Sequence, residues 1–144
     1  MSFTLREATI DDCAEILEIR NEKEVRINSF DPNKIEYAAH EKWFKGVLAN
    51  PSRKILILDN GQIAGVLRFD MDSERAETSI YLAPEYFGRG LGEILLIRGE
   101  EWLRNKHPAI KQLTAKIKSD NTRSQSLFAK FGFVEQGEIW VKKI

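Results

Sequence analysis

The sequence predicts an α/β protein in which helices flank a central mixed, mostly antiparallel sheet. Alternating apolar residues form neighbouring strands in the first half of the chain, and strand-like and helix-like segments alternate in the second half. Early hairpins give antiparallel pairs and later crossover helices give a parallel pair, so the sheet is mixed. A chain of 144 residues has the length of one ordinary domain, and we expect residues 1–144 to form it.

The first third of the chain predicts one strand and two helices. A short strand through Phe3 and Leu5 leads to Asp11-Asp12, which suits the cap of a helix. Asp31-Pro32 pairs a capping residue with a residue that suits the first helical turn, which predicts a second helix that ends before Asn50.

The middle of the chain predicts three antiparallel strands. Ile55–Leu58 and Ile63–Phe69 flank Asn60-Gly61, the strongest short hairpin signal, and Ala76–Leu82 follows as a third strand. The remaining segments are listed in chain order: a helix over Leu91–Leu103, a strand over Leu113–Ile117, a short helix over Thr122–Phe131 and a final strand pair around Phe133 and Ile139–Val141.

The composition limits the class of partner. Lys plus Arg equals 22 and Asp plus Glu equals 22, so no overall field draws the chain to nucleic acid or to an anionic membrane. No stretch reaches the roughly 20 apolar residues of a membrane span, and the N-terminus lacks a signal-peptide pattern. Cys13 is the only cysteine and reads as a core residue, and no metal site is predicted. We expect a cytoplasmic protein, either monomer or homodimer.

Three glycines at alternate positions, Gly88, Gly90 and Gly92, separate the third strand of the middle region from the following helix. Glycine lets consecutive backbone N–H groups turn toward one concavity, and the helix start adds its positive dipole end. Arg89 adds a side-chain cation within the loop. Taken alone the glycines are also compatible with a plain tight turn, but the pattern favours a site for a phosphate or a diphosphate.

The run from Leu82 to Gly92, LAPEYFGRGLG, resembles the pyrophosphate-binding motif of the GNAT superfamily of N-acetyltransferases. A second run, from Asn121 through Ser124 and Phe128 to Gly132-Phe133, is similar to the family's second cofactor segment. Together the two runs cover roughly the C-terminal half of the chain. The resemblance implies the GNAT-type acyl-CoA N-acyltransferase fold, with acetyl-CoA as co-substrate.

The resemblance also implies which residues hold the co-substrate. The third strand would pair with the pantetheine arm, the glycine turn with the pyrophosphate, and the second segment with the thioester region or the ribose phosphate. The implied cofactor-binding residues are Ile80, Tyr81, Leu82, Gly88, Arg89, Gly90, Leu91, Gly92, Glu93, Asn121, Ser124, Phe128 and Lys130. Two positions depart from the family pattern: Phe87 stands where Gln or Arg is usual, and Phe128 stands where many members have a proton-donating tyrosine.

Three residues are candidates for proton transfer. Glu77 resembles the carboxylate that several family members use as a base, although a strand-edge glutamate is as often a surface group. His40 suits proton transfer near neutral pH, but a histidine hydrogen-bonded beside Trp43, or one that only touches the substrate, is the favoured interpretation. Tyr81 could supply the proton that Phe128 cannot.

The N-terminal half carries a narrower resemblance, to acetyltransferases of nucleotide-linked amino sugars. It rests on Arg20-Asn21, Val25-Arg26, Ser29-Phe30 and His40-x-x-Trp43-Phe44. The implied substrate-binding residues are Asn21, Arg26, Phe30, His40 and Trp43. From the residues themselves we expect at least two of Trp43, Phe44 and Phe30 to belong to the core instead.

The preferred function is transfer of an acetyl group to a primary amine of a small molecule. An enzyme of the same fold that acts on protein N-termini, lysines or polyamines stays open as an alternative. So do a non-catalytic acetyl-CoA-binding module, because of Phe128, and a partner-binding scaffold without a ligand.

Overall fold

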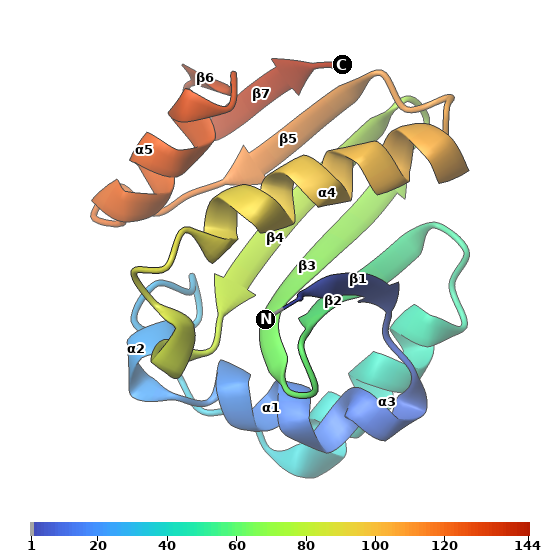
Figure 1. Ribbon diagram of the computed structural model, residues 1–144, viewed down its shortest axis with the longest axis vertical. Helices are drawn as coiled ribbons and strands as arrows, with labels where there is room; N and C mark the ends of the chain where they lie inside the picture. Colours follow the sequence, from blue (N-terminus) through green and yellow to red (C-terminus); the bar gives the residue numbers. More distant parts are fainter. Residues whose placement is uncertain (1) are drawn as a thin grey trace.

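The computed structural model describes residues 2–144 and contains one seven-stranded sheet in the order β1-β2-β3-β4-β5-β7-β6 (Figure 1). Neighbouring strands are antiparallel except β4 and β5, which are parallel, so the predicted mixed, mostly antiparallel sheet is confirmed. The strands are β1 Thr4–Glu7, β2 Arg53–Asp59, β3 Ile63–Asp72, β4 Arg75–Leu82, β5 Gln112–Lys116, β6 Val134–Gln136 and β7 Ile139–Lys143. Met1, the first residue of the expected domain 1–144, lies outside the described residues.

Five α-helices connect these strands. They are α1 Cys13–Arg20, α2 Lys23–Arg26, α3 Tyr37–Leu48, α4 Leu91–Lys106 and α5 Thr122–Lys130, and short 3₁₀ turns cover Ile10–Asp12 and Pro84–Tyr86. Between residues 2 and 144, no helix combines the length and the apolar character needed to cross a membrane.

Helices α3 and α4 cover opposite faces of the sheet. Leu67 contacts the position of Gly99 on α4, whereas its neighbour Arg68 lies over the ring of Trp43 on α3. Successive side chains of a strand point to opposite faces, so the two helices must lie on different sides. Figure 1 shows α4 crossing in front of β3 and β4, with α1 and α3 together at the other end of the molecule.

The second predicted helix begins later than expected. Helix α3 starts at Tyr37, and the Asp31-Pro32 pair lies in the loop before it. The Asp31 side chain accepts a hydrogen bond from the backbone N–H of Asn33 at 3.1 Å, so it closes a local turn. Aspartate stabilises such turns as readily as it caps helices, which is why the sequence pattern was misleading here.

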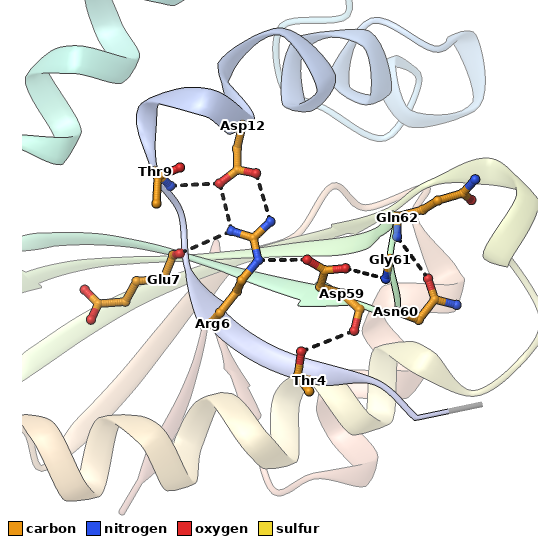
Figure 2. Close-up of polar contacts among 9 residues, drawn as sticks. All are labelled: Thr4, Arg6, Glu7, Thr9, Asp12, Asp59, Asn60, Gly61 and Gln62. Atoms are coloured by element: carbon orange, nitrogen blue, oxygen red, sulfur yellow. Dashed lines mark hydrogen bonds and ion pairs between the residues drawn. The ribbon is translucent and has the colours of Figure 1, made fainter.

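A polar network fixes the direction of α1 (Figure 2). The Arg6 guanidinium donates to both carboxylate oxygens of Asp12 at 2.9 Å and, through Nε, to Asp59 at 2.8 Å. Asp12 also accepts from the backbone N–H of Thr9 at 2.8 Å, which caps the turn that leads into α1. The network therefore ties β1, the start of α1 and the β2–β3 turn together.

Candidate active site between strands β4 and β5

Strands β4 and β5 pair over three residues and then separate. The pairs run from Arg75 with Gln112 to Glu77 with Thr114, whereas β4 stays paired with β3 as far as Leu82. The two strands diverge visibly in Figure 1 toward the end where α4 and α5 begin. A cleft of about 500 Å³ opens in the gap. Because the β4 edge beyond Glu77 faces this cleft without a strand partner, its backbone groups are available to an extended ligand.

The glycine turn stands at the mouth of this cleft. Gly88 and Gly90 have φ angles of +76° and +74°, a region that favours glycine, and α4 starts at Leu91. The amides of residues 88–90 donate no hydrogen bond within residues 2–144, and helix geometry leaves the first-turn amides without acceptors. A Cβ atom on Gly88 or Gly90 would have no heavy atom within 4 Å. The turn therefore combines amides that have no protein acceptor with open space beside it, which suits an anion.

The cationic side chains near this turn differ in their availability. Arg89 lies over the Tyr86 ring, 5.2 Å from its centroid, and Lys130 forms an ion pair with Glu93 at 2.6 Å. Neither of these two cations lines the cleft. Arg123 does, with its guanidinium 5.7 Å from the centroid of the Phe87 ring.

The second predicted segment reaches the cleft through α5. Asn121, Ser124 and Phe128 all line it. The Asn121 side chain caps α5 by accepting from the Ser124 N–H at 3.2 Å, while its amide nitrogen makes no hydrogen bond within the described chain. Phe128 is buried edge-on against Phe133, with ring centroids 4.9 Å apart. Phe128 therefore offers apolar contact, and any proton for a leaving group must come from elsewhere.

On β4, Ile80, Tyr81 and Leu82 line the cleft. Burial raises the pKa of the Tyr81 phenol above its usual range, against the smaller opposing effect of the Arg20 and Arg68 charges. Tyr81 is thus a neutral hydrogen-bond donor at physiological pH.

Glu77 is the last β4 residue that pairs with β5, one position before the cleft opens. Its carboxylate lies 3.6 Å from the Lys116 ammonium, and its side chain is 34% exposed. Lys116 lines the cleft but Glu77 does not. The structure therefore places Glu77 beside the cleft, in reach of it through a water or a side-chain rotation.

His40 lies away from the cleft. It is 3% exposed, its Nε2–H donates to the Cys13 carbonyl oxygen at 3.0 Å, and its ring stacks on Phe44. Burial lowers the pKa of His40, so the ring is neutral. His40 does not line the cleft, and the one polar contact of its side chain is internal, so this geometry gives no support to its role as a base or substrate ligand.

Asn21 and Arg26 form hydrogen bonds with the backbone of the loop between α2 and α3. The Asn21 side chain exchanges two 2.9 Å hydrogen bonds with the backbone of Ile35. Arg26 donates to the carbonyl oxygens of Asn21 at 2.9 Å and Pro32 at 3.0 Å. Neither residue lines the cleft, so this geometry gives no support to the expected contact of these two residues with substrate.

Of the three rings Trp43, Phe44 and Phe30, only Phe44 belongs to the core, which contradicts the expectation of two core rings. Phe30 is 66% exposed and lines the cleft. Trp43 is 37% exposed and does not line the cleft, and the guanidinium groups of Arg53 and Arg68 lie 5.7 Å and 5.5 Å from the centroid of its ring. Of the five predicted substrate residues, the cleft contains Phe30 alone.

The cleft residues that the predicted site did not include contain two arginines from the N-terminal half of the chain. Arg20 ends α1 and Arg68 lies in β3, and both line the cleft. A signal for Arg20 existed, since it continues the buried helical stripe of Ile16 and Leu17 at spacings of four and three. A charged residue at an inward position indicates either a buried partner or a ligand. Among residues 2–144, no group of three His, Cys, Asp or Glu side chains is arranged to hold a metal ion.

Comparisons with known proteins agree with this architecture. A crystal structure of a protein provisionally named as a phosphinothricin N-acetyltransferase has a TM-score of 0.86 at 26% identity, over 99% of this chain and 98% of that one. A structure of the aminoglycoside acetyltransferase AAC(6')-Ib with paromomycin and acetyl-CoA has a TM-score of 0.85 at 23% identity, over 99% and 94%. At 23% identity, the comparison with AAC(6')-Ib is evidence for a shared fold and not for a shared substrate.

A relative from Bacillus subtilis (strain 168), provisionally named as a [ribosomal protein bS18]-alanine N-acetyltransferase, is 28% identical over 99 residues. The match covers 67% of this chain but 64% of that relative, so the chain spans less than two thirds of its length. The profile of the acetyltransferase (GNAT) family matches residues 13–133, which include strands β4 and β5 on the two sides of the cleft. The chain belongs to this family.

Proposed function

We propose that this protein transfers an acetyl group from acetyl-CoA to a primary amine of a small molecule. The observation that carries the proposal is the set of open backbone amides at residues 88–93, at the mouth of a cleft where two parallel strands separate. Acetyl-CoA supplies an activated acetyl group as a thioester, and its diphosphate and pantetheine match the amide turn and the free β4 edge in chemistry and order. Family membership and the acetyl-CoA complex of AAC(6')-Ib support the same assignment.

The residues that hold the co-substrate divide into two groups. Backbone groups of Ile80–Leu82 and of Gly88–Glu93 bind through the main chain, so side-chain identity matters little there. Asn121 donates from its free amide nitrogen, while Ser124 and Phe128 provide the facing wall. We assign the cation nearest the phosphates to Arg123, because Lys130 is paired with Glu93.

The reaction requires a neutral amine and a proton for the sulfur. The amine nitrogen bonds to the carbonyl carbon as the carbon–sulfur bond breaks, one amine proton leaves, and the sulfur takes up one proton. We assign removal of the amine proton to Glu77, acting through a water, because it stands where the cleft begins. We assign donation of the proton to the departing sulfur to Tyr81, which lines the cleft on β4, in place of Phe128.

A nucleotide-linked amino sugar is one acceptor of this kind. Arg20, Ser29 and Phe30 belong to the N-terminal pattern that resembles acetyltransferases of nucleotide-linked amino sugars, and all three line the cleft. An aromatic face and a cation suit a nucleotide base and a phosphate. The alternative is a protein N-terminus, which the name of the Bacillus subtilis relative suggests for that protein. The open outer end of the cleft beside Phe30, which is 66% exposed, has room for either.

The test is thiol release from acetyl-CoA over a panel of amines, run beside thermal shift with coenzyme A. The proposal predicts stabilisation by coenzyme A and amine-dependent thiol release. Stabilisation by coenzyme A without thiol release for any amine would favour the non-catalytic binding module. The absence of both stabilisation and thiol release would overturn the proposal. Glu77→Gln is expected to lower kcat without weakening coenzyme A binding, and an unchanged kcat would assign the base elsewhere.

A further inference from the structure

Two arginine side chains from distant parts of the chain line the cleft. Arg20 comes from the C-terminal end of α1 and Arg68 from the middle of β3, and both line the cleft with Tyr81 and Phe30. Neither arginine belongs to the amide turn or to the segments assigned to the co-substrate, so we assign this part of the cleft to the acceptor.

Arg20 is half-buried and has no matching anion. Its Nη2 donates to the backbone carbonyl of Asp31 at 3.2 Å, while its Nη1 is buried and has no hydrogen-bond partner. Within residues 2–144 no carboxylate lies within ion-pair distance of it. Burial lowers the pKa of Arg20, as expected for a cation removed from water without compensation. A charged donor in this state is costly unless a ligand satisfies it.

Arg68 is held in a fixed orientation. Its Nε donates to Asp70 at 3.2 Å and its guanidinium lies 5.5 Å from the centroid of the Trp43 ring. Asp70 is shared with Arg53, whose Nε donates to it at 2.8 Å. The two terminal nitrogens of Arg68 make no hydrogen bond within the described chain, so a second planar donor group is ready beside Arg20.

The other charged groups of the cleft do not cancel these two cations. Glu24 and Asp120 are exposed carboxylates at the rim, and neither forms an ion pair within residues 2–144. Lys116 is paired with Glu77. A polyamine would bring further positive charge to the arginines, whereas an anionic group would satisfy them.

We propose that the acceptor is an amine that also carries a carboxylate or a phosphate group, and that Arg20 and Arg68 bind this anion. The proposal rests on the proposed function, since it concerns the acceptor end of the same cleft. It separates anionic acceptors from the cationic polyamines that the family fold also accommodates.

Simple anions test the site without knowledge of the acceptor. The protein is saturated with coenzyme A and titrated with phenylacetate, with the nucleotide UDP, and with neutral 2-phenylacetamide, each followed by thermal shift and NMR. We expect phenylacetate or UDP to bind and the amide not to bind. Binding of phenylacetate alone indicates a small amino acid, and binding of UDP alone indicates a nucleotide-linked acceptor. If coenzyme A binds but neither anion does, this proposal is wrong and the proposed function stands.

Variants then assign the binding to the arginines. Arg20→Met should lower the affinity for the anion by about 10- to 100-fold, which corresponds to the loss of one hydrogen bond to a charged group. Arg20→Lys should retain part of this affinity. Arg104→Met is the matched control, because Arg104 lies on the outer face of α4 and pairs only with Glu100. Equal anion affinity in Arg20→Met and Arg104→Met, with both proteins folded and binding coenzyme A, would overturn the proposal.

Discussion

The two ends of the cleft are built differently. At the co-substrate end the ligand-facing groups are backbone amides between Gly88 and Glu93 and the free edge of β4, all within one stretch of chain. At the acceptor end they are side chains of Arg20, Phe30 and Arg68, which come from separate elements. A backbone site tolerates changes in side chains but not in backbone shape, whereas a side-chain site can change its ligand by single substitutions.

The largest effect is expected where this contrast is sharpest, at the glycine turn. Gly90→Val should weaken coenzyme A binding by at least about 100-fold, because the new side chain fills the open space before the amides and strains a φ of +74°. Gly137→Val is the control, since Gly137 has a φ of +66° in the β6–β7 turn, away from the cleft. Calorimetry on both variants checks this, and equal losses would mean that strain alone explains the effect.

The Arg6 network that holds the start of α1, the helix that carries Arg20, should contribute to the stability of the fold. Arg6→Met should lower the free energy of unfolding by about 2 kcal/mol, a value already reduced for partial exposure of the pair. The Arg6 guanidinium lowers the pKa of both Asp12 and Asp59. Carboxylates with lowered pKa stabilise the fold at neutral pH and lose this contribution as pH falls below about 4.

Urea unfolding between pH 7 and pH 2 measures both parts of that prediction. The wild-type protein should lose stability on acidification more steeply than Arg6→Met. The control is Arg75→Met, an exposed arginine at the start of β4. Parallel curves for wild type and Arg6→Met would contradict the account of the network.

Tyr81 stands at the junction of the two ends. Tyr81→Phe should lower kcat about 10-fold, below the roughly 100-fold or more that is usual for a general acid, with unchanged coenzyme A affinity. Tyr37→Phe removes an exposed hydroxyl on α3 and should have no kinetic effect. Steady-state kinetics with binding measured separately distinguishes the two variants, and wild-type turnover in Tyr81→Phe would remove Tyr81 from the mechanism.

The smallest effect is expected at His40. Because the ring is buried, neutral and hydrogen-bonded to the Cys13 carbonyl oxygen, His40→Gln should leave the acceptor KM unchanged. The substitution should lower the free energy of unfolding by about 1 kcal/mol. The lowered pKa of His40 makes wild-type stability fall as pH drops below about 6.5, a slope that His40→Gln should lack. A raised KM in this variant would return His40 to the substrate site.

The same contrast explains what the sequence could predict. The hairpin around Asn60-Gly61, the helix that begins at Leu91 and the glycine turn follow from local backbone chemistry, and the structure contains all three. Asn21, Arg26 and His40 also looked functional as residue types, but their hydrogen bonds close onto the protein itself. Which polar side chain points into a cleft depends on tertiary packing, so the pattern could not separate them from Arg20 and Arg68.

The most direct measurement of the central claim is calorimetric titration of the folded protein with coenzyme A and with pantetheine, which lacks the diphosphate. If the amides of the turn before α4 bind the diphosphate, coenzyme A should release or absorb heat on binding and pantetheine should bind at least about 10-fold more weakly. Equal affinities, or no heat with coenzyme A at millimolar concentration, would contradict the account.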